Sequence, residues 1–572
     1  MSDPRVEVDV AIVGSGFAGS LLARALRGEG LRVALLERVR HPRFALGESS
    51  TPLANLALER LARRYGLADL WELAAHGRWL ESHPELGRGL KRGFTFYRQP
   101  TGARFQGGER EGRLLVAASP DDGVADTHWL RADVDRHFAE RAVAEGALLI
   151  EGVETILLDL DERGVELALG GPGDEHVEAG QPPRPRSTSR LRCGFLVDAS
   201  GSGGFVARAL GIGAHPAPLR FASRLLYSHF GGVPRFAEVE PAAASPADPY
   251  AADWAAVHHL SDTGWMYQLR FDDGTVSAGV LVDPSREERL GVALSWHDPG
   301  VAWQEWLDRH PSLALQFRGA EPLRPIVATP GPIQRRAAQA AGARWAMLPQ
   351  AYGSFDALYS TGIAWSLLAV ERLAMVLGAA HADGGGVPAD PPGLEAYAGR
   401  LEAEADQLER LLTVGYRQLA DFERFAGGAQ LYFALASFEE TRQRLLEPQN
   451  EARCRVGELE PSWAWDGFLG ALDPVAVELL EGALERTGAD GAAGATPAQE
   501  LRWARAAIAA RNVAGLCDEA RHPLYPVDFE AVVEGARLLG LEPAEARRRL
   551  PRLISPRRFP GRSRPARRSL DG

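Results

Sequence analysis

Lysine is almost absent from this chain of 572 residues. Lys91 is the only lysine, so arginine supplies 63 of the 64 basic side chains. An arginine stays protonated inside a protein, whereas a buried lysine can lose its proton and act as a nucleophile or a proton donor. A biased composition alone explains one surviving lysine. Lys91 therefore becomes a candidate functional residue only if neighbouring motifs support it.

Cysteines, long apolar runs and a positive net charge are also missing. Cys193, Cys454 and Cys517 have no metal-ligand spacing and imply no disulfide framework, which favours a reducing cytoplasm. We find no signal peptide and no apolar run of the roughly 18 residues that a membrane span requires. A net charge of −12 argues against nucleic acid as a partner. We expect a cytoplasmic protein of two or three domains, with no membrane and no nucleic acid.

The start of the chain has the pattern of a dinucleotide-binding unit. The stretch VEVDVAIVGSGFAGSLLARALRGEGLRVALLERV predicts a strand, a glycine turn, a helix and a second strand. Gly14 permits the tight turn, Gly16 lets the backbone approach a pyrophosphate, and Gly19 lets the helix pack close to the strand. Glu37 ends the second strand, where an acid binds a ribose hydroxyl. The helix N-terminus offers free N–H groups to the phosphates.

Four later motifs accompany this unit in a fixed order. They are Gly47-Glu48-Ser49 with Pro52, Arg131 with Asp135, Asp198-Ala199-Ser200-Gly201, and Ser360-Thr361-Gly362. The last one opens an apolar helix whose first N–H groups can bind a halide or a flavin carbonyl. Together the motifs resemble the flavin monooxygenase group of FAD-dependent oxidoreductases, and most closely its flavin-dependent halogenase branch, over about residues 5 to 380.

This resemblance implies FAD as the cofactor and assigns residues to it. Those implied to bind FAD are Gly14, Gly16, Gly19, Glu37, Glu48, Ser49, Arg131, Asp198, Gln350 and Gly362. The loop Ser360-Thr361-Gly362 is implied to lie by the flavin ring and to hold the halide. No metal site is expected, because His258-His259 lacks further ligands at a suitable spacing.

The resemblance also gives Lys91 a catalytic role. Flavin-dependent halogenases carry an essential lysine, often in a K-x-G sequence before an aromatic run, and here Lys91-Arg92-Gly93-Phe94 occupies that position. In the family, halide is oxidised to hypohalous acid, which the lysine captures or hydrogen-bonds beside the substrate. The alternation of Phe94 and Phe96 predicts a half-buried strand that holds Lys91 near its start.

Three departures from the halogenase pattern keep other activities open. The W-x-W-x-I-P signature is reduced to Trp265-Met266-Tyr267-Gln268-Leu269-Arg270, which favours a monooxygenase or hydroxylase. Gln350 replaces the usual aspartate that binds a ribityl hydroxyl. Tyr359 replaces the glutamate of tryptophan halogenases, which argues only against that type. An alkene reductase of the geranylgeranyl reductase type and a non-enzymatic flavoprotein are the remaining alternatives.

The reaction would need partners that the sequence only partly defines. They are a small-molecule substrate, aromatic or bound to a carrier, and a halide ion. No second G-x-G-x-x-G occurs in a strand-helix-strand context, so the electrons come from a separate flavin reductase or from NAD(P)H that binds transiently.

The predicted fold is α/β. We expect a Rossmann-like FAD-binding domain of the glutathione-reductase type over 5–380, with an antiparallel substrate-binding sheet interleaved at about 80–190 and 215–340. LLYSHFGGV, WMYQLRF and TVSAGVLVD are strands of that sheet. Helical spacing predicts a helical C-terminal domain over 394–552, and the Arg- and Pro-rich residues 553–572 are expected to be a disordered tail.

Overall fold

The apolar run after Arg5 forms the centre of a parallel sheet in the computed structural model of the chain. The structure describes residues 5–170, 175–176, 184–185, 189–382, 386–451, 467–488 and 496–554. Of the expected tail at 553–572, the first two residues belong to the end of a helix, and residues 555–572 lie outside the described residues. β1 pairs in parallel with β12 on one side and with β2 on the other, as buried β-branched strands do. The Rossmann-like fold class is confirmed.

The first sheet runs in the order β20-β21-β12-β1-β2-β7. In addition, β9 pairs with β12, and β8 pairs with β9. Its strands are β1 (Arg5–Val13), β2 (Val33–Glu37), β7 (Leu148–Glu151), β8 (Glu154–Asp161), β9 (Gly164–Gly170), β12 (Ser189–Asp198), β20 (Ala341–Gly342) and β21 (Trp345–Met347). We expected 80–190 in the substrate-binding sheet, and for β7 to β9 this was wrong. β9 pairs antiparallel with β12, which keeps this hairpin on the first sheet.

The second sheet has the order β17-β13-β16-β15-β14-β4-β5-β23, with β18 beside β13. Its strands are β4 (Gly93–Arg98), β5 (Arg113–Ala117), β13 (Arg224–Gly231), β14 (Ala256–Leu260), β15 (Gly264–Arg270), β16 (Val276–Val282), β17 (Glu321–Pro322), β18 (Val327–Ala328) and β23 (Leu524–Tyr525). The antiparallel pairing of β13, β16 and β15 confirms the three strands predicted from LLYSHFGGV, TVSAGVLVD and WMYQLRF.

Three two-stranded pairs complete the described strands. They are β3 (Arg88–Lys91) with β6 (Asp126–Trp129), β10 (Glu175–His176) with β11 (Arg184–Pro185), and β19 (Arg335–Arg336) with β22 (Gly353–Ser354). Lys91 is thus the last residue of β3, and not near the start of the strand that contains Phe94. That strand, β4, is buried on both faces from Gly93 to Tyr97, because the face we expected to be exposed is also covered. The Thr95 hydroxyl donates to the carbonyl oxygen of Ala252, and the Tyr97 ring packs against Phe236.

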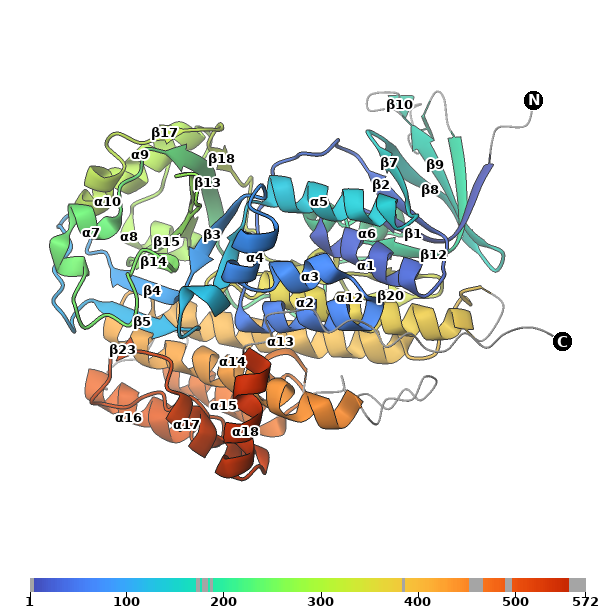
Figure 1. The fold of residues 1–572 in the computed structure, drawn as a ribbon. Helices are drawn as coiled ribbons and strands as arrows, with labels where there is room; N and C mark the ends of the chain where they lie inside the picture. Colours follow the sequence, from blue (N-terminus) through green and yellow to red (C-terminus); the bar gives the residue numbers. More distant parts are fainter. Residues whose placement is uncertain are drawn as a thin grey trace.

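Helices cover the first sheet and extend past it (Figure 1). In the first two thirds of the chain they are α1 (Phe17–Gly28), α2 (Pro52–Tyr65), α3 (Ala68–Leu73), α4 (His76–Ser82), α5 (Arg131–Ala144), α6 (Phe205–Ala209), α7 (Phe236–Val239), α8 (Pro284–Leu290), α9 (Pro299–Arg309), α10 (Pro311–Gln316), α11 (Pro349–Tyr352) and α12 (Gly362–Ala382). α1 packs against α5 and α12, and α12 packs against α2.

The last part of the chain is mostly helical and lies beneath both sheets in Figure 1. Its helices are α13 (Leu394–Gln418), α14 (Phe422–Glu451), α15 (Pro474–Thr487), α16 (Pro497–Ala507), α17 (Phe529–Gly535) and α18 (Pro543–Ile554). It also contributes β23, whose Leu524 and Tyr525 pair in parallel with Leu115 and Val116 of β5. The predicted helical character is therefore present, while the division into domains stays a prediction.

Helix α12 is long and apolar enough to cross a membrane by length and composition. Its best window has a mean hydropathy of 1.6, but 89% of that window is buried inside the protein. Side chains such as Leu367, Leu373 and Leu377 belong to the main hydrophobic core. We therefore interpret α12 as a core helix.

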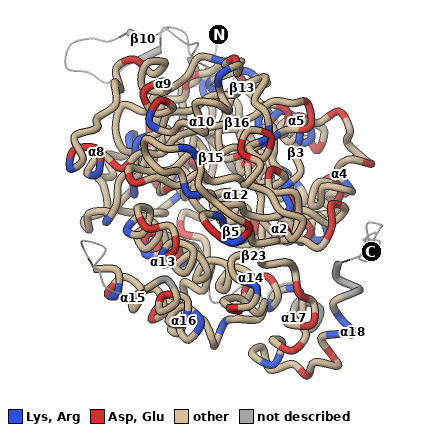
Figure 2. Tube along the Cα trace, turned by 90° about the vertical axis from the view of Figure 1, so that its left-hand side faces the viewer, with Lys and Arg blue, Asp and Glu red and all other residues tan. Residues whose placement is uncertain are grey.

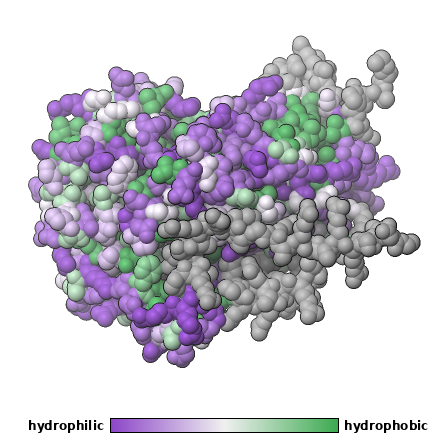
Figure 3. Space-filling model, in the orientation of Figure 1, coloured by the Kyte–Doolittle hydropathy of each residue, from purple (hydrophilic) through white to green (hydrophobic). Residues whose placement is uncertain are grey.

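The charges that give the net value of −12 are dispersed. Figure 2 shows acidic and basic residues interspersed along the elements, without a large surface of one sign. The face in Figure 3 is largely hydrophilic, and apolar side chains gather on it where β7 and β8 lie. Leu148 and Leu158 are exposed there.

Candidate active site

The glycine turn between β1 and α1 is shaped by two close approaches. Gly14 has φ +105°, and a Cβ atom there would lie 2.4 Å from the carbonyl oxygen of Ala199. A Cβ atom at Gly19 would lie 2.1 Å from the carbonyl oxygen of Gly14. Neither distance is compatible with a side chain, so both positions require glycine. The turn thereby meets the Asp198-Ala199-Ser200-Gly201 turn directly.

Glu37 lies beside this glycine turn, as its place at the end of β2 predicted. Its Oε2 accepts hydrogen bonds from the backbone N–H of Ser15 (3.0 Å) and from the Ser15 hydroxyl (3.2 Å). Arg43 forms an ion pair of 3.2 Å with the same oxygen. The Ser15 hydroxyl is also 2.8 Å from Nε2 of His41. Glu37 thus orders the turn, and its contact with a ribose stays a prediction.

Two guanidinium groups surround the backbone at Gly16. A Cβ atom there would lie 3.3 Å from Arg43 Nη2 and 3.7 Å from Arg131 Nη2. Asp135 shares the space: its Oδ1 accepts from the N–H of Phe17 (3.1 Å), and Arg43 lies 3.7 Å from its Oδ2. Arg43 Nε is buried without a hydrogen-bond partner. Cations and helix N–H groups around an open backbone position suit a phosphate.

Arg131 connects the glycine turn to the Gly47-Glu48-Ser49 segment. It binds both oxygens of Asp135 (2.8 and 2.9 Å) and donates to the carbonyl oxygens of Leu46 (2.5 Å) and Gly47 (3.1 Å). The hydroxyl of Ser49 is buried and has no hydrogen-bond partner. An orphaned buried hydroxyl at this point is what an absent ligand would leave.

Glu48 faces the second sheet. Its Oε1 lies 2.9 Å from Nε2 of His229 on β13, and both side chains are buried. This contact joins residues that are 181 positions apart. The backbone carbonyl oxygen of Glu48 accepts a hydrogen bond from the N–H of Trp129 at 2.6 Å. The assignment of Glu48 to FAD binding stays a prediction.

Asp198 binds the protein with both carboxylate oxygens. Oδ1 accepts from the N–H and hydroxyl of Ser200 (2.9 and 2.6 Å), and Oδ2 accepts from the N–H of Val206 (2.7 Å). Burial raises its pKa, which these hydrogen bonds oppose. Asp198 thus fixes the turn against which Gly14 packs, and direct contact with FAD stays a prediction.

A backbone hydrogen bond and helix α11 link Asp198 to the Ser360-Thr361-Gly362 loop. The N–H of Leu348 donates to the carbonyl oxygen of Asp198 (2.9 Å), and α11 begins one residue later. On α11, Gln350 places its side-chain amide 3.4 Å from the position of a Cβ atom at Gly362. The structure therefore brings Gln350 and the loop together, as the cofactor assignment requires.

The Ser360-Thr361-Gly362 loop is strained at its first residue. Ser360 has φ +53°, in the left-handed region that residues other than glycine rarely adopt. Such strain costs about 1–3 kcal/mol and is concentrated at functional sites. α12 begins at Gly362, so the first N–H groups of this helix have no intrahelical partner. They form a site for an anion or a polarised oxygen.

Asp356 anchors the segment that leads into this loop. Its Oδ2 accepts from the hydroxyls of Tyr416 (2.5 Å) and Ser223 (2.8 Å), and its Oδ1 accepts from the N–H of Leu358 (3.0 Å). Trp265 Nε1 donates to the same Tyr416 hydroxyl at 3.3 Å. The tryptophan that survives from the halogenase signature is therefore coupled to the loop. Burial raises the pKa of Asp356 to about 6.

Replacing Asp356 with asparagine is expected to remove a pH-dependent loss of stability. Because the folded-state pKa of Asp356 is raised from 3.8 to about 6, its ionisation destabilises the fold as the pH rises through this interval. The wild type should lose about 2–3 kcal/mol relative to Asp356→Asn between pH 4 and pH 7. Urea unfolding of both proteins at each pH measures this difference. Parallel stability curves would contradict the prediction.

Lys91 is fully buried, at 0% exposure. Its Nζ donates to the carbonyl oxygen of Ser50 at 2.6 Å and lies 4.1 Å from the centre of the Phe94 ring. Burial lowers its pKa, and the carboxylate of Asp126 opposes this effect. The sole lysine is thus neither on the surface nor in an ordinary surface ion pair.

A chain of aromatic rings joins Lys91 to the Ser360-Thr361-Gly362 loop. The Phe94 ring beside Lys91 lies 5.7 Å from Tyr432, and Tyr432 stacks at 4.7 Å on Tyr359, the residue before Ser360. Tyr432 belongs to α14 and is buried. The two candidate halide-handling groups, far apart in sequence, therefore border one aromatic cluster.

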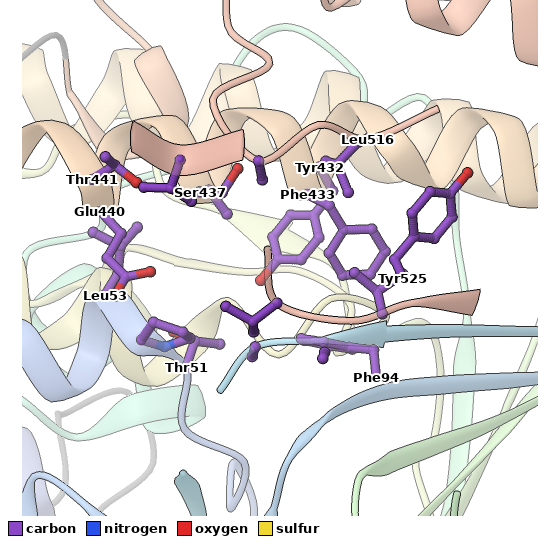
Figure 4. A pocket seen from close by; sticks show the side chains of 18 of the residues that line it. Thr51, Leu53, Phe94, Tyr432, Phe433, Ser437, Glu440, Thr441, Leu516 and Tyr525 are labelled. Atoms are coloured by element: carbon purple, nitrogen blue, oxygen red, sulfur yellow. The ribbon is translucent and has the colours of Figure 1, made fainter. Parts of the chain in front are cut away.

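A cavity opens on the other side of this cluster. It contains about 930 Å³ of empty space, part of it open to solvent, between the second sheet and the C-terminal part of the chain. Figure 4 shows the rings of Phe94, Tyr432, Phe433 and Tyr525 at one side and Ser437, Glu440 and Thr441 at the other. Thr51, next to Ser50, also lines it. The lining among the described residues includes no Lys, Arg or His, and Lys91 contacts the lining residue Phe94, with Nζ 4.1 Å from the ring centre.

The residues at the glycine turn fit an anionic dinucleotide such as FAD. Two guanidiniums, a helix N-terminus and the unpartnered polar groups of Arg43 and Ser49 surround the space at Gly16 and Gly47. Within the described part of the chain, no group of three or more His, Cys, Asp or Glu residues could hold a metal ion. His258 and His259 are buried in β14.

Sequence reasoning missed several members of this site. His41 and Arg43 follow β2 in a stretch without periodicity, and only the proximity to Glu37 in sequence could have indicated them. His229 and Tyr432 come from segments far from any motif, and no local pattern could have identified them. Asp356 lies four residues before Ser360, so its proximity to the loop motif was the one available signal.

Comparisons with known proteins agree with this geometry. The NAD(P)-binding Rossmann-like domain family matches residues 12–54. Tetracycline 7-halogenase of Kitasatospora aureofaciens is 27% identical over 376 residues, which cover 64% of this chain and 64% of that enzyme. Monodechloroaminopyrrolnitrin halogenase PrnC of Pseudomonas fluorescens is 26% identical over 64% of this chain and 60% of its own length. The matches thus span just under two thirds of these relatives.

Solved structures extend the similarity over most of the chain. The crystal structure of halogenase PltM superposes with a TM-score of 0.75 and 20% identity, covering 91% of this chain and 99% of that one. The flavin-dependent brominase Bmp2 superposes with a TM-score of 0.58 and 18% identity, covering 84% and 99%. This chain therefore has the fold of the flavin-dependent halogenases, and the resemblance indicated by its motifs is confirmed.

Proposed function

We propose that this protein is an FAD-dependent halogenase that uses reduced FAD, O₂ and a halide ion to halogenate a small aromatic molecule. One observation carries the proposal. The only lysine of the chain is fully buried, and a single layer of aromatic rings connects it to the strained Ser360-Thr361-Gly362 loop and to a cavity. A lysine that survived by chance would be expected on the surface.

FAD would be held by the residues of the first sheet. The turn at Gly14 to Gly19 and the guanidiniums of Arg43 and Arg131 would bind the phosphates, and Ser49 would donate its free hydroxyl. Gln350 and Gly362 would lie by the flavin. When bound and reduced, FAD would react with O₂ to supply the oxidant of the halide. A separate flavin reductase would supply the electrons that reduce FAD.

Lys91 would handle the oxidised halogen. Its Nζ donates one N–H to the Ser50 carbonyl oxygen and lies over the Phe94 ring, 4.1 Å from its centre. An ammonium there would donate a hydrogen bond to hypohalous acid. A neutral amine would instead attack its halogen, forming an N–halogen bond as the halogen–oxygen bond breaks, and the departing hydroxide would take a proton from the nitrogen and leave as water. The surrounding rings exclude water from Lys91. A hypohalous acid held there would be shielded from side reactions with the solvent.

The substrate would be neutral or basic. The cavity is lined by aromatic and aliphatic side chains, and its two charged lining residues among those described are the acids Glu440 and Asp528. An anionic substrate would therefore lose its hydration without gaining a cationic partner. An electron-rich ring with a hydroxyl or amino group suits both the lining and electrophilic halogenation. The structure of PltM in complex with phloroglucinol and FAD, a protein 20% identical to this chain, supports a phenol.

The proposed activity is testable with two phenols that differ in charge. We expect the protein with FAD, NADH, a flavin reductase, O₂ and bromide to brominate tyramine at least about tenfold faster than 3-(4-hydroxyphenyl)propionate. Mass spectrometry detects the product, and a reaction without halide is the control. A panel of phenols, pyrroles and indoles without any halogenated product would contradict the proposal.

A monooxygenase is the second candidate, because the halogenase signature is incomplete. Tyr267 and Leu269-Arg270 stand where the signature has its second tryptophan and Ile-Pro, and all three lie on β15. If this strand no longer keeps the substrate from the flavin, oxygen would be transferred directly. A hydroxylated product that forms equally well without halide would favour this candidate.

A further inference from the structure

The pairing of β3 with β6 places a second ionisable side chain beside Lys91. In this antiparallel pair Lys91 is directly opposite Asp126, so both side chains leave the same face. Asp126 is 2% exposed and Lys91 is 0% exposed. A buried ammonium and a buried carboxylate on directly opposed residues affect each other strongly, because little water screens them.

Asp126 is held in a way that leaves one oxygen available. The side-chain amide of Asn55 on α2 donates to its Oδ1 at 2.8 Å. Its Oδ2 is buried without a hydrogen-bond partner. Within the residues that the structure describes, no hydrogen bond or ion pair joins Asp126 directly to Lys91. The carboxylate therefore acts on Lys91 through space, and only one of its two oxygens accepts a hydrogen bond.

The other polar groups around Lys91 do not supply a competing negative charge. His128 on β6 and His258 on β14 are neutral near pH 7, because burial lowers the pKa of each to about 3. On α14, Tyr432 is a phenol whose pKa is raised by burial, and Glu440 is paired with Arg444 at 2.8 Å. Asp126 is thus the carboxylate directly opposite Lys91 in the strand pair, and no described ion pair joins it to another cation.

We propose that Asp126 is a positioning residue that favours the protonated form of Lys91 for the halogen-handling step. Burial by itself favours the neutral amine, which is a weaker hydrogen-bond donor to hypohalous acid than the ammonium. The carboxylate on β6 opposes that effect. Asp126 therefore widens the interval of pH over which Lys91 carries its proton. The link to halogenation rests on the function proposed above, whereas the charge coupling does not.

The single lysine makes this proposal directly measurable. Protein grown with lysine labelled with ¹³C at Cε gives one lysine resonance, because the chain contains one lysine. Titration of that resonance in the FAD-loaded protein reports the pKa of Lys91. In Asp126→Asn we expect this pKa to fall by about one unit or more, since an opposite charge at short range has that effect. Asp126→Glu should restore most of it.

A matched control separates this effect from a general loss of charge. Asp122→Asn removes an exposed carboxylate that pairs with Arg92 next to Lys91 in sequence, and it should leave the Lys91 resonance unchanged. If Asp126→Asn fails to fold, Asn55→Leu tests the same idea. It removes the donor to Oδ1, which raises the pKa of Asp126 and thus lowers that of Lys91.

Activity gives a second, separable readout. The alkaline limb of the pH profile of kcat should move to lower pH in Asp126→Asn, with KM for the phenol unchanged. An identical Lys91 titration in wild type and Asp126→Asn would overturn the proposal. A shifted titration in a protein that makes no halogenated product from any substrate would instead refute the proposed function and leave the coupling intact.

Discussion

Replacing Lys91 with arginine is expected to lower halogenated product formation by about 100-fold or more, within the usual range for losing a positioned acid–base group. The guanidinium stays protonated and is too large for a fully buried site that fits a single Nζ between Ser50 and Phe94. FAD binding should persist, because Lys91 has no hydrogen bond or ion pair with the glycine turn, Arg43 or Arg131 among the described contacts. Product is measured by mass spectrometry, and cofactor binding by quenching of flavin fluorescence.

A swap of two neighbours provides the control for this substitution. The double variant Lys91→Arg, Arg92→Lys keeps the composition and moves the only ammonium by one residue, into the position that binds Asp122. It should be as inactive as Lys91→Arg, while both continue to release hydrogen peroxide from reduced flavin and O₂. Full activity in Lys91→Arg would show that the lysine is only a remnant of a biased composition.

Replacing Gly14 with alanine is expected to abolish FAD binding, with at least a 100-fold rise in Kd. The added Cβ atom would lie 2.4 Å from the Ala199 carbonyl oxygen, and φ +105° is unfavourable for alanine. The β1–α1 turn and the Asp198–Gly201 turn would have to separate. FAD titration by fluorescence and thermal unfolding measure the two consequences.

Two further glycines distinguish a clash from backbone strain and from ligand contact. Gly211 has φ +67° with no atom within 4 Å of a Cβ atom, so Gly211→Ala should cost about 1 kcal/mol of strain and leave FAD binding unchanged. Gly16→Ala meets only the flexible ends of Arg43, Asp135 and Arg131, so it should fold and still weaken FAD binding. Wild-type affinity in Gly14→Ala and Gly16→Ala would place the cofactor elsewhere.

Local patterns predicted the parts of the fold whose geometry depends on neighbours in sequence. The strand, turn and helix at Val6 to Gly28 follow from a buried apolar run and from glycines at fixed spacing, and both are readable in one stretch. Which sheet a strand joins could be predicted less well from the sequence. β7 joined the first sheet by pairing with β2, and the β8–β9 hairpin joined it because β9 pairs with β12. Nothing in their own residues specifies those partners.

The same distinction holds within the candidate site. The motifs predicted that Gly16, Arg131 and the Ser360 loop matter, because each has a characteristic local sequence. The contacts that complete the site cross large distances: Glu48 meets His229, and Tyr359 meets Tyr432. Such pairs are fixed by the packing of whole elements. Contacts of Thr95 with Ala252 and of Tyr97 with Phe236 likewise turned an expected half-exposed strand, β4, into a fully buried one.

The short strand β23 has a consequence for how the protein avoids self-association. Its Leu524 and Tyr525 bond to Leu115 and Val116 and so occupy the outer edge of the second sheet. An uncovered β5 would offer free backbone donors and acceptors to any other extended chain, which is the usual route to edge-to-edge aggregation. The last part of the chain, which reaches β5 about 400 residues later in sequence, therefore also acts as an intramolecular shield for the edge that borders the cavity.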